Sequence, residues 1–138
     1  MKERMSLMVF SGTVDKLMTA SILATGGAAM GLEVEIFLAN WGLAAFRKGD
    51  YRENFRITRE YEDYGPLMMQ QMQAKNVPSW MENLKAAKEV GDVTVLACSM
   101  TLELFGWTKD DLEPIVEDVT GVATFVERAK DSKITLFI

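Results

Sequence analysis

The one cysteine of the chain, Cys98, is its best candidate for a nucleophile. It ends the apolar run Val93–Cys98, which is typical of a buried strand, and a helical pattern follows from Ser99 to Phe105. The thiolate is the reactive form of cysteine, and the partial positive charge of a helix N-terminus stabilises it. The position therefore favours a reactive thiol, although a free cysteine is equally typical of an inert core position.

The absence of histidine narrows the chemistry open to Cys98. Without histidine the chain has no Cys–His or Ser–His–Asp machinery, and one cysteine can form neither an internal disulfide nor a zinc cage. No aspartate-rich loop resembles a calcium site. We therefore expect no metal and no other cofactor, and a reaction of Cys98 with a small molecule or another chain.

Composition excludes several classes of partner. The 138 residues are enough for one domain with a real core, and 49% hydrophobic and 25% charged residues are ordinary globular values. The net charge of -5 is spread along the chain, without the basic stripe of a nucleic-acid-binding protein. The most apolar stretch, residues 17–32, is interrupted by polar residues and too short to span a bilayer. With no signal peptide pattern and a single cysteine, we expect a cytoplasmic protein.

Apolar runs alternate with helical periodicities along the chain, which predicts βαβ units and a mainly parallel sheet with helices on both faces. The predicted strands are residues 5–10, 32–38, 93–98 and 134–138. The main predicted helices are residues 14–30, 80–90 and 121–130. The charged and aromatic segment 49–79 predicts an insert with one or two short helices within a single domain, 1–138. A fifth strand is expected in or near that insert.

Two of the predicted strands carry more detailed expectations. In 32–38, Glu33 and Glu35 alternate with apolar residues, which predicts a half-exposed strand near a sheet edge. The final run, 134–138, predicts a buried strand.

The carboxyl ends of parallel strands meet at one rim of the sheet, where ligands bind in open α/β folds. Three loops follow strands at that rim, and we predict a site there with Cys98 as its catalytic residue. Its predicted binding residues are Ser11, Gly12, Thr13, Asn40, Trp41, Gly42, Ser99 and Met100. Turn formation, helix capping and core packing explain the same residues, and the first loop is too short for a phosphate-binding fingerprint. Arg47 or Arg56 could reach a ligand, but the spacing of these arginines in the sequence does not support that role.

Three segments together resemble the DsrE/DsrF-like family, in the branch often labelled peroxiredoxin-like. They are Phe37–Leu43 (FLANWGL), Val95–Met100 (VLACSM) and Gly121–Phe125 (GVATF), and the final ITLFI fits as well. The resemblance covers nearly the whole chain. It implies an α/β domain with flavodoxin-like layering and a parallel sheet of about five strands, assembled as a homo-oligomer. The peroxidatic Pro-x-x-x-Thr-x-x-Cys pattern is absent before Cys98.

The resemblance also implies a sulfur carrier or sulfurtransferase. Its functional cysteine falls on Cys98, which would hold sulfane sulfur as a persulfide or thiosulfonate and pass it to a partner thiol. The donors and acceptors would be proteins or small sulfur compounds. Two alternatives stay open: a noncatalytic scaffold subunit of an assembly, and a small-ligand-binding domain in which Cys98 merely lines the cleft.

Overall fold

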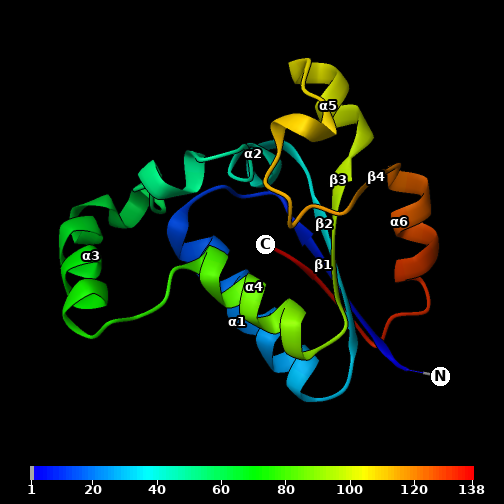
Figure 1. Ribbon diagram of the computed structural model, residues 1–138, viewed down its shortest axis with the longest axis horizontal. Helices are drawn as coiled ribbons and strands as arrows, with labels where there is room; N and C mark the ends of the chain where they lie inside the picture. The colour runs from blue at the N-terminus through cyan, green and yellow to red at the C-terminus, as the bar shows by residue number, and fades with distance from the viewer. Residues whose placement is uncertain (1) are drawn as a thin grey trace.

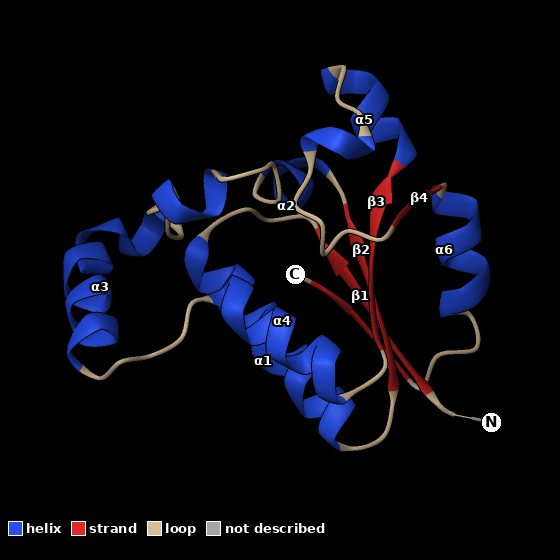
Figure 2. Ribbon diagram, in the orientation of Figure 1, coloured by secondary structure: helices blue, strands red, loops and turns tan. Residues whose placement is uncertain are grey.

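Five parallel strands form one sheet in the computed structural model, which describes residues 2–138 (Figures 1 and 2). The strands are β1 (Arg4–Val9), β2 (Glu33–Leu38), β3 (Val93–Cys98), β4 (Asp118–Thr120) and β5 (Ile134–Phe137). Their order across the sheet is β4-β3-β2-β1-β5, and each neighbouring pair is parallel. The predicted α/β class with a parallel sheet of about five strands is confirmed.

Helices cover both faces of the sheet, as predicted. They are α1 (Val14–Ala29), α2 (Asn40–Ala44), α3 (Gly65–Ala74), α4 (Trp80–Val90), α5 (Ser99–Phe105) and α6 (Val122–Ala129). Three 3₁₀ turns are η1 (Asp50–Glu53), η2 (Arg59–Tyr64) and η3 (Lys109–Asp111). Helices α1 and α4 pack side by side on one face and α6 lies on the other (Figure 1). Within residues 2–138, no helix is both long and apolar enough to cross a membrane.

Local sequence signals account for the ends of the two long helices. Helix α1 stops just before Gly31, whose φ of 78° is a left-handed conformation that favours glycine. Helix α4 begins with a capping box: the Ser79 hydroxyl accepts from the Glu82 N–H at 3.1 Å, and the Glu82 carboxylate accepts from the Ser79 N–H at 3.2 Å. Both boundaries agree with the predicted ones.

The main core lies between the sheet and the pair α1 and α4. Alternate residues of each strand point to opposite faces, and on this face Leu7, Ile36 and Val95 are at most 1% exposed. They meet Leu17 of α1 and Met81 of α4 in one buried cluster. Burying a side chain of this size contributes about 1.5–3 kcal/mol, so this layer supplies much of the stability that holds the strand ends in place.

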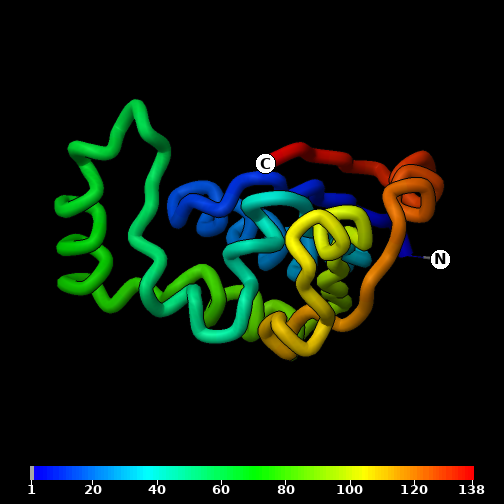
Figure 3. Tube along the Cα trace, turned by 90° about the horizontal axis from the view of Figure 1, so that it is seen from above, coloured from blue at the N-terminus to red at the C-terminus, as the bar shows by residue number. Residues whose placement is uncertain are grey.

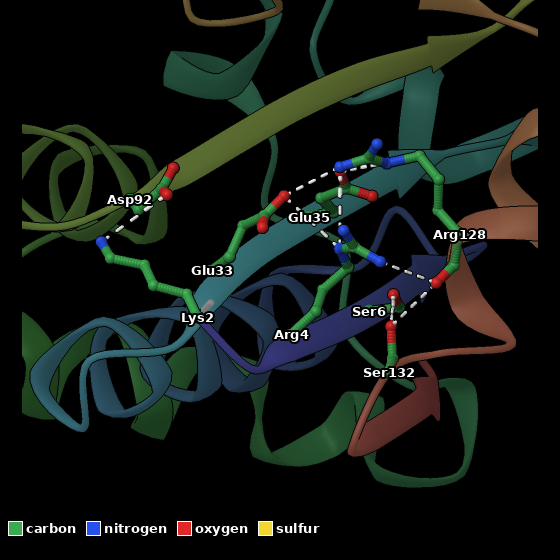
Figure 4. A network of polar contacts seen from close by, with 8 residues as sticks. All are labelled: Lys2, Arg4, Ser6, Glu33, Glu35, Asp92, Arg128 and Ser132. Carbon is green, nitrogen blue, oxygen red and sulfur yellow. Dashed lines mark hydrogen bonds and ion pairs between the residues drawn. The ribbon is translucent and has the colours of Figure 1, made fainter.

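Helix α6 covers the opposite face, with an aromatic contact from its middle and ion pairs near its C-terminus. Phe125 stacks on Phe37 of β2 with the ring centroids 4.7 Å apart. Arg128 pairs with Glu33 at 2.8 Å and with Glu35, and Arg4 donates to the Arg128 carbonyl at 2.9 Å (Figure 4). The hydrogen bond to Glu35 raises the pKa of Arg128 despite the opposing effect of burial.

The packing of α6 on β2 explains why residues 32–38 are not the half-exposed strand near a sheet edge that the sequence predicted; that prediction was wrong. Strand β2 is the central strand, and Glu35 is only 4% exposed. The alternating glutamates face α6 rather than solvent, and Arg4 and Arg128 compensate their charge. A buried ion-paired glutamate and a solvent-facing one leave the same alternating pattern in the sequence.

Two further strand predictions were also wrong. Strand β5 is an edge strand that pairs only with β1, and its residues Ile134 and Leu136 are 38% and 37% exposed. The fifth strand is β4, which pairs with β3 at the other edge and lies outside the insert. With only three residues and the exposed Asp118, β4 has too little apolar character to be predicted.

The insert 49–79 contains η1, η2 and α3, and α3 lies apart from the sheet in both views (Figures 1 and 3). Its first part is tied to the start of α1. The Val14 N–H donates to the Arg56 carbonyl at 2.7 Å, and the Thr58 N–H and hydroxyl both donate to the Asp15 carboxylate. These bonds hold residues 54–58 at the carboxyl rim of the sheet.

Candidate functional site

The first two rim loops are in direct contact. A Cβ on Gly12 would lie 2.3 Å from the Trp41 carbonyl oxygen, and a Cβ on Gly42 would lie 2.2 Å from that of Val9. The Gly42 N–H also donates to the Phe10 carbonyl at 2.8 Å. Only glycine allows this approach of backbone to backbone. Residues 40–42, predicted as a loop, form the start of α2, and α2 is locked against the loop after β1.

The third rim loop is joined to the second through Asn40. The Asn40 N–H donates to the buried hydroxyl of Thr101 in α5 at 3.1 Å. Asn40 has a φ of 50°, a left-handed conformation that asparagine adopts more readily than most residues. Its side chain does not cap α2, contrary to the simplest expectation for this position. Its backbone instead fixes the position of α5.

Cys98 ends β3 and is the N-cap of α5, as the sequence predicted. It is a free cysteine, only 7% exposed. It packs in a small cluster with Phe37, Ala39 and Phe125, beneath α6 rather than towards α1 and α4. The N–H groups of the first turn of a helix have no intrahelical acceptor, so those of Ser99 and Met100 are available as donors next to Cys98. Ser99 is half-buried and Met100 is exposed.

A cleft of about 810 Å³ opens at the same rim, but Cys98 does not line it. The structure thus divides the predicted site residues into two groups. Ser11, Gly12, Thr13 and Trp41 line the cleft. Cys98, Ser99 and Met100 lie at the start of α5, and Asn40 and Gly42 serve as backbone links between the loops.

Other residues of the cleft come from segments whose proximity the hydrophobic periodicity of the sequence does not predict. Arg47 and Arg56 both line it, which no spacing in the sequence indicated. Phe105 and Trp107, at the end of α5, were not singled out at all. Their only signal is a pair of aromatic residues around Gly106, whose φ of 71° ends the helix.

The protein is therefore an α/β protein with a five-stranded parallel sheet, and it carries a buried free thiol where β3 meets α5. The chain belongs to the DsrE/DsrF/DrsH-like family, which it matches over residues 1–61 and 56–137. The resemblance to the DsrE/DsrF-like family seen in the sequence is thereby confirmed.

Two relatives match the chain over almost its whole length. The uncharacterized protein YrkE of Bacillus subtilis is 30% identical over 157 aligned positions, covering 99% of this chain and 97% of YrkE. The sulfur carrier protein DsrE2 of Allochromatium vinosum is 27% identical, covering 99% of both chains.

Two solved structures share the fold. The protein MTH1491 of Methanobacterium thermoautotrophicum has a TM-score of 0.62 at 18% identity, covering 99% of this chain and 100% of its own. The ychN protein of E. coli has a TM-score of 0.61 at 17% identity, with full coverage of both chains. At these identities the likeness concerns the fold alone.

Proposed function

We propose that the protein is a sulfur carrier, in which Cys98 holds sulfane sulfur and passes it to a partner thiol. The observation that carries the proposal is the position of this one cysteine, at the junction of β3 and α5, in a chain of the DsrE/DsrF/DrsH-like family. The full-length similarity to a protein named as a sulfur carrier supports the same role. A reducing cytoplasm would keep such a thiol free.

The proposed chemistry is thiol exchange at sulfur, which needs no histidine. The Cys98 thiolate attacks the outer sulfur of a persulfide R–S–SH; the new S–S bond forms as the old one breaks, and R–S⁻ leaves. With tetrathionate, the same attack leaves a thiosulfonate on Cys98 and releases thiosulfate. An acceptor thiolate then attacks the sulfane sulfur bonded to the Cys98 Sγ. That S–S bond breaks and the Cys98 thiolate leaves, so no net oxidant is required.

The groups around Cys98 suit an anionic sulfur chain. The free N–H groups at Ser99 and Met100 can donate to a thiolate, a persulfide or a sulfonate oxygen. Asn40 and Gly42 act through their backbones. The Asn40 N–H bond to Thr101 holds the start of α2 beside α5, and the Gly42 N–H bond to the Phe10 carbonyl holds it against the loop after β1. Since Cys98 is 7% exposed, a donor must displace part of the Phe125 contact before it can reach the sulfur.

We also propose that the carrier works as a homo-oligomer assembled through the β5 edge. Apolar side chains are exposed there without a cover in the single chain: Phe10, Ile134, Leu136 and Phe137. Phe10 stacks on Phe137 at 5.8 Å, which makes one continuous aromatic surface. An exposed apolar edge strand is a ready site for pairing with another copy.

Intact-mass measurement after incubation with tetrathionate or polysulfide tests the carrier role. We expect one thiosulfonate or one added sulfur per chain, and none on Cys98→Ser. Adding a thiol acceptor should return the protein to its original mass. If Cys98 reacts no faster than a simple thiol at neutral pH, or the sulfur is never passed on, the protein is a noncatalytic subunit instead.

A relocated cysteine provides the matched control. The double variant Cys98→Ser, Lys75→Cys carries one cysteine on an exposed residue just after α3. It keeps the thiol count and the fold but removes the start of α5 from the reaction. We expect the wild type to pass sulfur to an acceptor faster than this variant; equal rates would mean that the site contributes nothing.

A further inference from the structure

The cleft of about 810 Å³ at the carboxyl rim is built from three distant parts of the chain, residues 11–13, 41–56 and 105–107, and Cys98 does not line it. Its volume lies in the range of small-molecule sites. Trp41 of α2 lies beside Phe105 and Trp107 on one side of the cleft, and residues of η1 with Asn54 and Arg56 form another wall. No part of the sulfur chemistry proposed above uses it.

Three aromatic rings form the apolar side of the cleft. Phe105 stacks on Trp107 with the centroids 4.6 Å apart, and Trp41 lies 5.8 Å from Phe105. Trp41 is 53% exposed, whereas the third tryptophan, Trp80, is buried in the core at 3%. A large exposed indole in a concave site offers a free face on which a planar ring can stack.

Two arginines supply positive charge beside these rings. The Arg47 guanidinium lies over the Trp107 ring, 4.7 Å from its centroid, a geometry that leaves its in-plane N–H donors free. Neither Arg47 nor Arg56 forms an ion pair with any carboxylate of residues 2–138. Asp50 and Glu53 also line the cleft and balance the charge of the two arginines. An anion is therefore held by hydrogen bonds from the guanidinium groups, and a second negative charge on it would meet no surplus positive charge.

The arginine wall is held in place before any ligand arrives. The Asn54 amide donates to the Gly12 carbonyl at 2.9 Å and accepts from the Arg56 N–H at 3.2 Å. The Arg56 carbonyl accepts from Val14 at the start of α1. The backbone that carries Arg56 is thereby fixed against the loop after β1, which lowers the cost of ordering it on binding.

We propose that this cleft is a second site, which binds a small organic monoanion carrying an aromatic ring. The ring stacks on the free face of Trp41, and the carboxylate or other single anionic group accepts hydrogen bonds from Arg47 and Arg56. Because Cys98 does not line the cleft, binding is independent of sulfur transfer and persists in Cys98→Ser.

Ligands that share one ring and differ only in charge test the proposal. Indole-3-acetate, 3-methylindole and tryptamine present the same ring with a negative, neutral and positive group. Titrations followed by NMR of the indole N–H signals report the site, since Trp41 and Trp107 line the cleft and Trp80 does not. We expect indole-3-acetate to bind at least tenfold more tightly than either analogue and to shift Trp41 and Trp107 but not Trp80. Equal affinities, or shifts no larger than that of Trp80, would overturn the proposal.

Single substitutions test the two halves of the site. Arg56→Gln removes the cation but keeps the backbone bond to Val14, and we expect about tenfold weaker binding of indole-3-acetate, as for the loss of a charge-assisted hydrogen bond. Trp41→Ala should weaken it similarly. The control Arg52→Gln changes an exposed arginine that does not line the cleft and should leave the affinity unchanged. If Arg52→Gln weakens binding as much as Arg56→Gln, only overall charge matters and the site is refuted.

Discussion

Individual residues at the rim are constrained by backbone contacts more than by side-chain chemistry. Gly42 is the sharpest case, because a Cβ there would lie 2.2 Å from the Val9 oxygen and 2.9 Å from its carbonyl carbon. Gly26, within α1, has no atom within 4 Å of the place where a Cβ would lie. One glycine is therefore required by the fold and the other is not.

The two glycines give opposite predictions for replacement by alanine. Gly42→Ala forces α2 away from β1 and should lower the free energy of unfolding by more than about 2 kcal/mol. Gly26→Ala should raise it by about 0.5–1 kcal/mol, since alanine favours the helix. Chemical denaturation of both variants measures the difference. A neutral Gly42→Ala would mean that the two loops are not locked together.

Asp15 is the residue whose titration should be visible in stability. Burial tends to raise its pKa, but hydrogen bonds, including those from Thr58, outweigh burial and hold the pKa below the ordinary value of 3.8. A carboxyl with a lowered folded pKa stabilises the fold above its unfolded pKa, and the stabilisation is lost as the pH falls through the folded value.

The matched pair Asp15→Asn and Asp63→Asn tests this linkage. We expect Asp15→Asn to be less stable than the wild type at pH 7 and the gap to close below pH 3.8, as followed by urea denaturation across pH. Asp63→Asn, at an exposed aspartate of η2, should be as stable as the wild type at pH 7. A gap that persists unchanged at acid pH would show that the Asp15 charge is not what ties the insert to α1.

At the scale of elements, α6 decides how accessible Cys98 is. Phe125, in the middle of the helix, packs on Phe37 and Cys98, and Arg128, near its C-terminus, is fixed by the glutamates of β2. The helix is therefore anchored through Arg128 and in contact with the thiol through Phe125.

Shortening the side chain of Phe125 should expose the thiol of Cys98. Phe125→Ala should cost about 3 kcal/mol of stability, as for other buried aromatic residues, and should speed alkylation of Cys98 by iodoacetamide severalfold. Val126→Ala, at a 52% exposed position of the same helix, should change neither quantity. Unfolding monitored under the labelling conditions separates local uncovering from global opening. Unchanged labelling of folded Phe125→Ala would refute the role of α6 as the cover.

At the scale of the molecule, the two edges of the sheet differ in how many apolar side chains they expose. Strand β4 is short and polar at Asp118, whereas β5 exposes Ile134, Leu136 and Phe137. Of the two edges, β5 exposes more apolar side chains, and the proposed contact between copies is therefore assigned to it.

Light scattering after size exclusion tests the proposed assembly. We expect a mass well above the 15.5 kDa of one chain for the wild type, and a shift towards that mass for Phe137→Glu, because a charge would be buried in the interface. Val90→Glu, at an 83% exposed position that ends α4, should keep the assembly. A wild-type protein of 15.5 kDa would contradict the proposed oligomer.

Local signals determined most of the elements from the sequence alone. The Ser79 cap, the Gly31 stop and the apolar run up to Cys98 act within a few residues, so α4, α1 and the β3–α5 junction were predicted where the structure has them. The family was recognisable for the same reason, because short segments in a fixed order carry it.

Only the tertiary structure decided which surfaces are buried and which residues share a site. Glu35 is buried because Arg128, 93 positions away, covers it, and the last strand is exposed because no element packs beyond it. The same holds at the rim, where the thiol turned under α6 while Trp41 met Arg47, Phe105 and Trp107 in a separate cleft. Periodicity reports which residues share a face of one element, whereas burial and convergence depend on contacts between elements distant in the chain.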